Sequence, residues 1–325
     1  MKSPSSAPAL RLGVLDFGQF FPPQTADDLL AATRRYAPLA ESLGYSRYWL
    51  TEHHEPSMSW ANPEIMVPLL ADRTSRIRLG TAGTLLYFYS PYRVAETFAL
   101  LERLHPGRID CGLAAGVSAG PVREALRPGF DAAREHYAGD YGKRVGELLD
   151  YLRGNFPPDH QFARGPVPVG TRVPSIWLLG LGVGNRILAS RHGTHFSYSL
   201  IHGGSRQDPA IIRAYRDEFQ PSAELAAPVC NVACSVICAA TEAAAAAQRV
   251  IFERHVGGST LVNVCGTPDQ CREQLLALTE KFAVDELVFT SLWHLLPQRE
   301  DSYRMLADVM GLEPGPAESA AATRP

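Results

Sequence analysis

Strand-like runs and helical patterns alternate along this chain, and the alternation limits the possible folds more than any other feature. Apolar runs typical of strands cover residues 12–17, 47–54, 77–82, 108–113, 175–179, 194–200, 228–239 and 286–290. Helical spacing covers residues 26–43, 63–74, 91–104, 141–154, 185–192, 206–219, 241–253, 268–282 and 298–310. Two strands joined by a crossover helix run parallel. Eight such units predict a closed (β/α)8 TIM barrel, and an open doubly wound sheet is the alternative.

Length and composition are consistent with one soluble barrel. The chain has 325 residues, of which 46% are hydrophobic and 20% charged. We expect one barrel domain at residues 11–312, between flexible ends at residues 1–10 and 313–325. The net charge of -3 gives no electrostatic reason to bind nucleic acid or an anionic membrane. We expect a cytoplasmic protein, because no apolar run approaches the roughly 20 residues of a membrane span and no signal peptide is visible. The six cysteines lack zinc-binding spacing, so no metal site is predicted.

An acidic residue and two histidines, Glu52, His53 and His54, end the second expected strand. In α/β barrels ligands bind at the carboxyl ends of the strands. Alternation along the strand puts His53 on one face with Trp49 and Thr51, and His54 on the other, so at most one histidine points into the barrel. An inward histidine suits proton transfer near neutral pH. The alternative is a structural pair that bonds to backbone groups.

A second candidate site is the glycine-rich segment Gly180, Leu181, Gly182 and Gly184, which lies between an expected strand and an expected helix. Glycines there allow backbone N–H groups to approach an anion at the helix N-terminus. The spacing is not a clean dinucleotide fingerprint. A tight turn without a ligand is the alternative.

Small residues end the third expected strand, where Ala82 and Gly83 either allow close packing or make room for a flat ligand. Large aromatic residues are candidates for an apolar pocket at the barrel mouth, although a half-buried loop cluster explains them equally well. These candidates are Trp49, Tyr87, Phe88 and Tyr198. Such a pocket indicates a hydrophobic substrate.

Several motifs in order along the chain resemble the bacterial luciferase-like monooxygenases, which are flavin-dependent (β/α)8 barrels. The resemblance covers about residues 11 to 312. The motifs are Trp-Leu-Thr-Glu-His-His at 49–54, Asn-Pro at 62–63, Leu-Gly-Thr-Ala at 79–82, Ser-Pro-Tyr-Arg at 90–93, Gly-Arg at 107–108, Gly-Thr-Pro at 266–268 and Val-Asp-Glu-Leu at 284–287.

This resemblance implies an activity and a cofactor. Reduced flavin mononucleotide (FMN) would react with molecular oxygen to give a flavin hydroperoxide that oxygenates an organic substrate, with the reduced flavin supplied by a separate flavin reductase. His53 matches the family's catalytic histidine. The flavin ring would lie over Ala82 and Gly83, joined by a cis peptide bond, and the phosphate near residues 180–184. A homodimer is also expected.

Two departures from the family pattern concern the phosphate. Ala115 stands where the family usually carries arginine, and Leu181 stands in a segment that is commonly Gly-Ser-Ser. Lys143 and Arg144 could supply charge instead, or could simply be exposed. These departures keep open a barrel that has lost catalysis and serves as a binding or subunit partner. A deazaflavin-dependent hydride transferase on the same scaffold is the other alternative, and the Glu-His-His run favours the monooxygenase over it.

Overall fold

The computed structural model describes residues 10–55, 57–58, 60–116, 120–128, 137–163, 172–256 and 260–313. The flexible ends predicted at residues 1–10 and 313–325 lie outside these ranges, except for Leu10 and Glu313. None of the helices in the described ranges has the length and apolar character needed to cross a bilayer.

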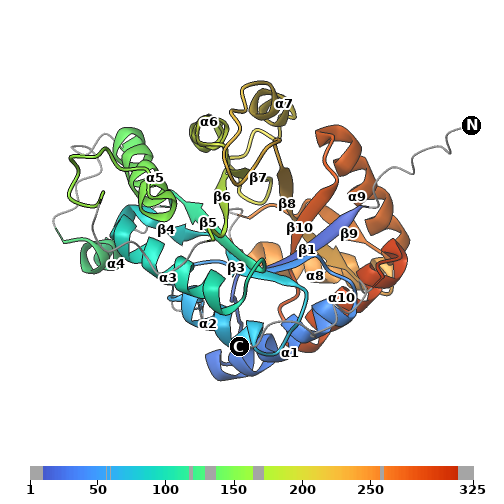
Figure 1. The fold of residues 1–325 in the computed structure, drawn as a ribbon. Coiled ribbons are helices and arrows are strands. Elements are labelled where there is room, and N and C mark those ends of the chain that lie inside the picture. The colour runs from blue at the N-terminus through green and yellow to red at the C-terminus, as the bar shows by residue number, and fades with distance from the viewer. Residues whose placement is uncertain are drawn as a thin grey trace, which may run out of the picture.

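Eight parallel strands close into a barrel, with the helices arranged around it (Figure 1). The barrel strands are β1 (Arg11–Asp16), β2 (Arg47–Leu50), β3 (Arg78–Thr81), β5 (Ile109–Ala114), β6 (Ser175–Gly180), β7 (His195–Ser199), β8 (Cys230–Cys238) and β10 (Glu286–Ser291). Closure is direct, because β10 pairs in parallel with β1 on one side and with β8 on the other. The predicted (β/α)8 barrel is therefore confirmed, and the open sheet is excluded. Two short strands extend the ring: β4 (Thr84–Leu85) pairs with β5, and β9 (Val264–Gly266) pairs with β8.

The helices follow the predicted order. They are α1 (Ala26–Ser42), α2 (Pro63–Ala71), α3 (Pro91–Leu104), α4 (Gly120–Leu126), α5 (Tyr137–Arg153), α6 (Val183–His192), α7 (Ala210–Asp217), α8 (Glu242–Val256), α9 (Pro268–Phe282) and α10 (Leu296–Met310), with a 3₁₀ turn η1 at Leu86–Phe88. No helix was expected from sequence between residues 113 and 141, but α4 forms there and α5 begins at Tyr137. The helix expected from residue 206 begins after Pro209, because proline disfavours helical geometry in the residue before it.

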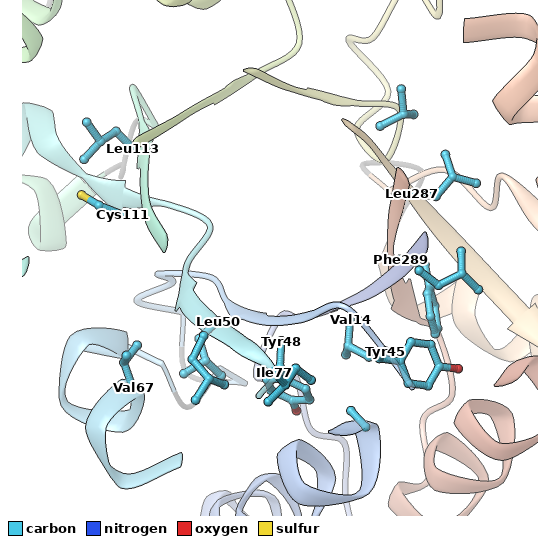
Figure 2. Close-up of a cluster of buried hydrophobic side chains, with 14 of the residues drawn as sticks. Val14, Tyr45, Tyr48, Leu50, Val67, Ile77, Cys111, Leu113, Leu287 and Phe289 are labelled. Carbon is cyan, nitrogen blue, oxygen red and sulfur yellow. The ribbon is translucent and has the colours of Figure 1, made fainter. Parts of the chain in front are cut away.

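The largest part of the core lies between the barrel and its helices. Figure 2 shows side chains such as Val14, Leu50, Leu113 and Phe289 pointing outward from the strands. A smaller cluster fills the barrel interior, with Leu15, Trp49, Trp177, Ile201, Ala233 and Val288 as its buried members. Side chains of each strand thus alternate between the outer core and the barrel interior, as the two-residue period of a strand requires.

Buried charges fill the amino-terminal end of the barrel. The Arg47 guanidinium lies 2.6 Å from Asp110 and 3.0 Å from Glu286, and all three side chains are at most 4% exposed. Trp49 Nε1 also donates to Asp110 (2.8 Å). Burial alone would raise the pKa of Asp110, but Arg47 and Arg78 hold that pKa below its ordinary value. The cavities described below lie at the opposite, carboxyl end of the strands.

Candidate functional site

The two histidines after β2 face opposite ways, as strand alternation predicts. His53 lines a cavity at the carboxyl end of the barrel. His54 instead places Nε2 2.9 Å from Glu52 Oε1, on the outer side of the strand. Glu52 also accepts hydrogen bonds from Leu85 N–H (2.8 Å) and the Tyr89 hydroxyl (2.5 Å), so this pair holds the chain that follows β3. Of the two, only His53 is placed for chemistry in the cavity.

The cavity beside His53, here called the β1–β10 cavity, has a volume of about 330 Å³. Its walls come from the carboxyl ends of β1 and β10, the segment after β2, and helices α8 and α10. Apolar side chains cover much of it, among them Phe21, Met58, Phe252, Leu292 and Trp293. Gln19, Ser291 and Arg299 add polar groups. This mixture suits an organic molecule with one polar end.

Phe17, Glu55 and His202 are the described side chains that interact with His53. The ring of Phe17 stacks on it, with centroids 5.2 Å apart and planes inclined by 21°. The Nδ1 atom of His53 lies 3.6 Å from Glu55 Oε2, and hydrogen bonding by His53 lowers the pKa of Glu55 to about 2. His202 lies next to Phe17 (6.2 Å between centroids), and burial, with a smaller contribution from His53, lowers its pKa. Burial thus favours the neutral form of His202, while Glu55 carries a negative charge at pH 7.

A second cavity of about 400 Å³, the β6–β7 cavity, adjoins the first. Leu15, Phe17 and His202 line both cavities and mark the boundary between them. Four of the predicted cofactor-binding residues line the β6–β7 cavity, namely Ala82, Ala115, Gly180 and Leu181. Three others, Gly83, Gly182 and Gly184, are not among its described lining residues. The structure thus brings residues from three separate motifs to one cavity.

The Ala82–Gly83 peptide bond is cis, as the family resemblance implies. Gly83 packs so closely on β5 that a Cβ there would lie 2.8 Å from Ala114 N and 3.0 Å from Gly112 O. No larger residue fits that position without moving the strands. Ala82 therefore remains as the small side chain that faces the cavity.

The glycine-rich segment forms the end of β6 and the start of α6. A Cβ at Gly180 would lie 2.9 Å from the Asn185 side-chain amide, which donates to Leu179 O. Gly182 is the N-cap of α6 and provides no side-chain cap, and a Cβ added at Gly182 or at Gly184 would meet no described atom within 4 Å. The side-chain positions of Gly182 and Gly184 are thus open, and the first N–H groups of α6 are of the kind that binds an anion.

The β6–β7 cavity is poor in positive charge. Among the described residues that line it, none is Lys or Arg. Arg144, considered from sequence as a substitute, lies 3.1 Å from Asp140 and donates to Tyr89 O (3.0 Å). Lys143 is exposed, and neither side chain reaches the lining. The groups that remain for an anion are the N-terminus of α6 and neutral side chains.

The prediction that four aromatic residues line the barrel mouth was wrong. None of Trp49, Tyr87, Phe88 and Tyr198 lines either cavity, and all are at most 6% exposed. Trp49 does point inward but lies deeper, bonded to Asp110. Tyr198 has the opposite strand parity and joins the outer core, so that Ser197 and Ser199 face the cavity instead.

Other lining residues were missed from sequence. Phe17 could have been predicted, because it directly follows β1 and residues at the carboxyl ends of barrel strands line the mouth. Ser197 and Ser199 could have been predicted from the alternation of side chains along β7. The Ser197 Oγ is buried and has no hydrogen-bond partner among the described residues. Arg299 comes from α10 and reaches the cavity only through tertiary packing, so no local pattern identifies it.

A parallel barrel with two joined cavities at its carboxyl end defines a ligand-binding α/β barrel of the enzyme type. The model of the luciferase-like monooxygenase family matches residues 10–263. The chain belongs to this family, which supports an oxidoreductase of the monooxygenase class.

Relatives and solved structures agree with this assignment. N-acetyl-S-alkylcysteine monooxygenase of Bacillus subtilis is 34% identical over 66% of this chain and 64% of its own length. The crystal structure of apo-MsnO8 superposes with a TM-score of 0.80 at 29% identity, covering 94% of this chain and 99% of its own. The oxygenase component of flavin-dependent trigonelline monooxygenase from Acinetobacter baylyi is 25% identical over 57% of this chain and 52% of its own. An F420-dependent secondary alcohol dehydrogenase shares the fold alone, with a TM-score of 0.67 at 14% identity, covering 93% of this chain and 99% of its own.

Proposed function

We propose that this chain is the oxygenase of a two-component flavin-dependent monooxygenase. It would take reduced FMN from a separate flavin reductase and use molecular oxygen to oxygenate a hydrophobic organic substrate. The observation that carries the proposal is the shared boundary of the two cavities, because Phe17 and His202 line both and lie beside His53. A cofactor and a substrate in adjoining cavities would be held within reach of one proton-transfer group.

The β6–β7 cavity fits a flavin. Its volume of about 400 Å³ lies within the range of small-molecule sites, roughly 300–1,000 Å³. Leu15, Ala82 and Ala233 give it the apolar surface that a flat ring needs. The unpartnered Ser197 hydroxyl is available to a polar edge of the ring, and the N-terminus of α6 is available to the phosphate. When bound, reduced flavin supplies the electrons that activate oxygen.

His53 would move the proton. With Nδ1 beside Glu55, Nε2 is the ring nitrogen left for the cavities, and Phe17 fixes the plane of the ring. A histidine in this position can donate a proton to a reacting oxygen, or can hold that oxygen in place with a hydrogen bond. Phe17 and Met58 give the cavity an apolar surface near His53.

We also propose that the chain forms a homodimer through α2 and α3, consecutive helices of the outer ring (Figure 1). Both carry large apolar side chains that are at least 48% exposed: Ile65 and Leu69 on α2, and Leu100 and Leu104 on α3. Large exposed apolar side chains on neighbouring helices are typical of subunit interfaces. Light scattering of the wild type and of Leu100→Glu tests the proposal; a monomeric wild type contradicts it.

The function itself is tested by single-turnover mixing. The protein, loaded with chemically reduced FMN, is mixed with isotopically labelled oxygen and a panel of hydrophobic substrates. Labelled oxygen in a product supports the monooxygenase. Oxygen-independent reduction of a substrate with reduced F420 would point to the deazaflavin alternative. If neither cofactor binds, the non-catalytic barrel is the better description.

A further inference from the structure

Arg299 is a buried cation without an anionic partner among the described residues. It lies in the first turn of α10, is 5% exposed and lines the β1–β10 cavity. Its Nη2 donates to the carbonyl oxygens of Gln19 and Trp293, both at 3.0 Å. Its Nε has no hydrogen-bond partner, and no described carboxylate lies within 4.0 Å of the guanidinium. Neutral carbonyl groups do not balance a buried charge, so the site is incomplete as it stands.

Ser291 adds a second unsatisfied group to the same cavity. It ends β10, the strand that leads into α10, and is 6% exposed. Its Oγ has no partner among the described residues. A guanidinium with free donors and a free hydroxyl, supplied by one β/α unit, are the kinds of group that bind a compact anion.

The acidic residues of this cavity are already engaged elsewhere. Glu55 lies beside His53. Asp16 accepts three hydrogen bonds, from Gly18 N–H (2.8 Å), the Thr33 hydroxyl (3.0 Å) and the Tyr48 hydroxyl (2.6 Å). Neither carboxylate therefore serves as the partner of Arg299.

We propose that the β1–β10 cavity takes a substrate that carries a carboxylate, bound by Arg299 and Ser291. The apolar body of this substrate would lie against the remaining wall of Phe21, Met58, Phe252, Leu292 and Trp293. The inference rests on the proposed function and narrows its hydrophobic substrate to an amphipathic acid. The acid is defined by its chemistry, a carboxylate on an apolar body.

The test compares probes of the same carbon skeleton in which a carboxylate is replaced by a neutral hydroxymethyl group: octanoate with octanol, and benzoate with benzyl alcohol. Binding to the full-length protein is measured by ligand-observed NMR or calorimetry, with and without saturating FMN. We expect the wild type to bind the acids at least tenfold more tightly than the alcohols. Arg299→Met should remove about tenfold to a hundredfold of the acid affinity, the size of a lost charge-assisted hydrogen bond. Arg304→Met is the control, because Arg304 lies on the same helix but is exposed and paired with Glu300.

Two further variants keep the test decisive if Arg299→Met does not fold. Ser291→Ala removes a hydroxyl that makes no hydrogen bond in the described chain, so it should fold normally and still weaken acid binding severalfold. Arg299→Lys keeps the charge but loses the planar fork, and should weaken acid binding by about tenfold. Equal binding of acids and alcohols by the wild type, or an unchanged preference in both variants, overturns the inference. Because binding is measured without turnover, that result would leave the monooxygenase proposal standing.

Discussion

The ring of Phe17 stacks on the ring of His53, with centroids 5.2 Å apart and planes inclined by 21°. Phe17 follows β1 and His53 follows β2, so two neighbouring strands bring the two rings together at the barrel mouth. Phe17 also separates the β1–β10 cavity from the β6–β7 cavity. The position of His53 is therefore tied to the wall between the two proposed ligands.

Replacing His53 by alanine should lower product formation by about a hundredfold or more, the usual contribution of a general acid or base. The fold should survive, because the His53 side chain is 27% exposed and its partner Glu55 is exposed, while the backbone hydrogen bond from His53 N–H to Trp60 O is kept in alanine. Single-turnover product yield and circular dichroism are the measurements. His54→Asn is the matched control, since His54 bonds to Glu52 away from the cavity. Full activity in His53→Ala would remove the proposed role.

Replacing Phe17 by leucine keeps an apolar wall but removes the stacked ring. Aromatic pairs contribute about 0.5–1.5 kcal/mol beyond their burial, so we expect product yield to fall by about twofold to tenfold. The loss should be smaller than in His53→Ala. A loss as large as that of His53→Ala would show that Phe17 does more than orient the histidine.

The described wall of the β6–β7 cavity lacks arginine and lysine, so oxidised FMN should bind weakly and the protein should purify nearly colourless. Ala115→Arg adds the missing charge beside the cavity and should tighten binding by about tenfold to a hundredfold. Calorimetric titration with FMN measures the effect. Ala246→Arg on exposed α8 is the control with the same change of net charge. Submicromolar affinity in the wild type would show that other groups hold the phosphate.

Arg47 neutralises two buried carboxylates at the amino-terminal end of the barrel. Arg47→Met would leave Asp110 and Glu286 without this partner, and we expect a loss of about 3–5 kcal/mol in the free energy of unfolding. Chemical denaturation measures the loss. Arg11→Met is the control, because Arg11 pairs with Asp285 at the surface and should cost less than about 1 kcal/mol. Similar losses in the two variants would contradict the prediction.

His195 makes stability depend on pH. Burial lowers the pKa of His195 from 6.5 to about 4 in the folded protein. Between these values the unfolded chain takes up a proton that the folded chain does not, so stability should fall as the pH drops from 6.5 to 4. The full effect is about 3 kcal/mol and is complete below pH 4. Denaturation of wild type and His195→Gln across this range should show a shallower slope in the variant; parallel slopes would refute the assignment.

The sequence alone determined the barrel and the part of the site that lies at strand ends. Eight strand patterns separated by helices allow few parallel arrangements, and the carboxyl end of β2 then places His53 at the mouth. Strand parity also predicted that His53 and His54 face opposite ways, because side chains alternate along a strand. These features depend on local periodicity, which a single sequence shows directly.

Other features of the site were decided only by the tertiary structure. Trp49 has the inward parity, yet its depth in the barrel follows from the partner it finds in Asp110, 61 residues away in sequence. Arg299 reaches the β1–β10 cavity from α10 and bonds to Gln19, 280 residues away. Depth and long-range neighbours depend on how the strands close and how the last helix packs on the first strands, and no local pattern records either.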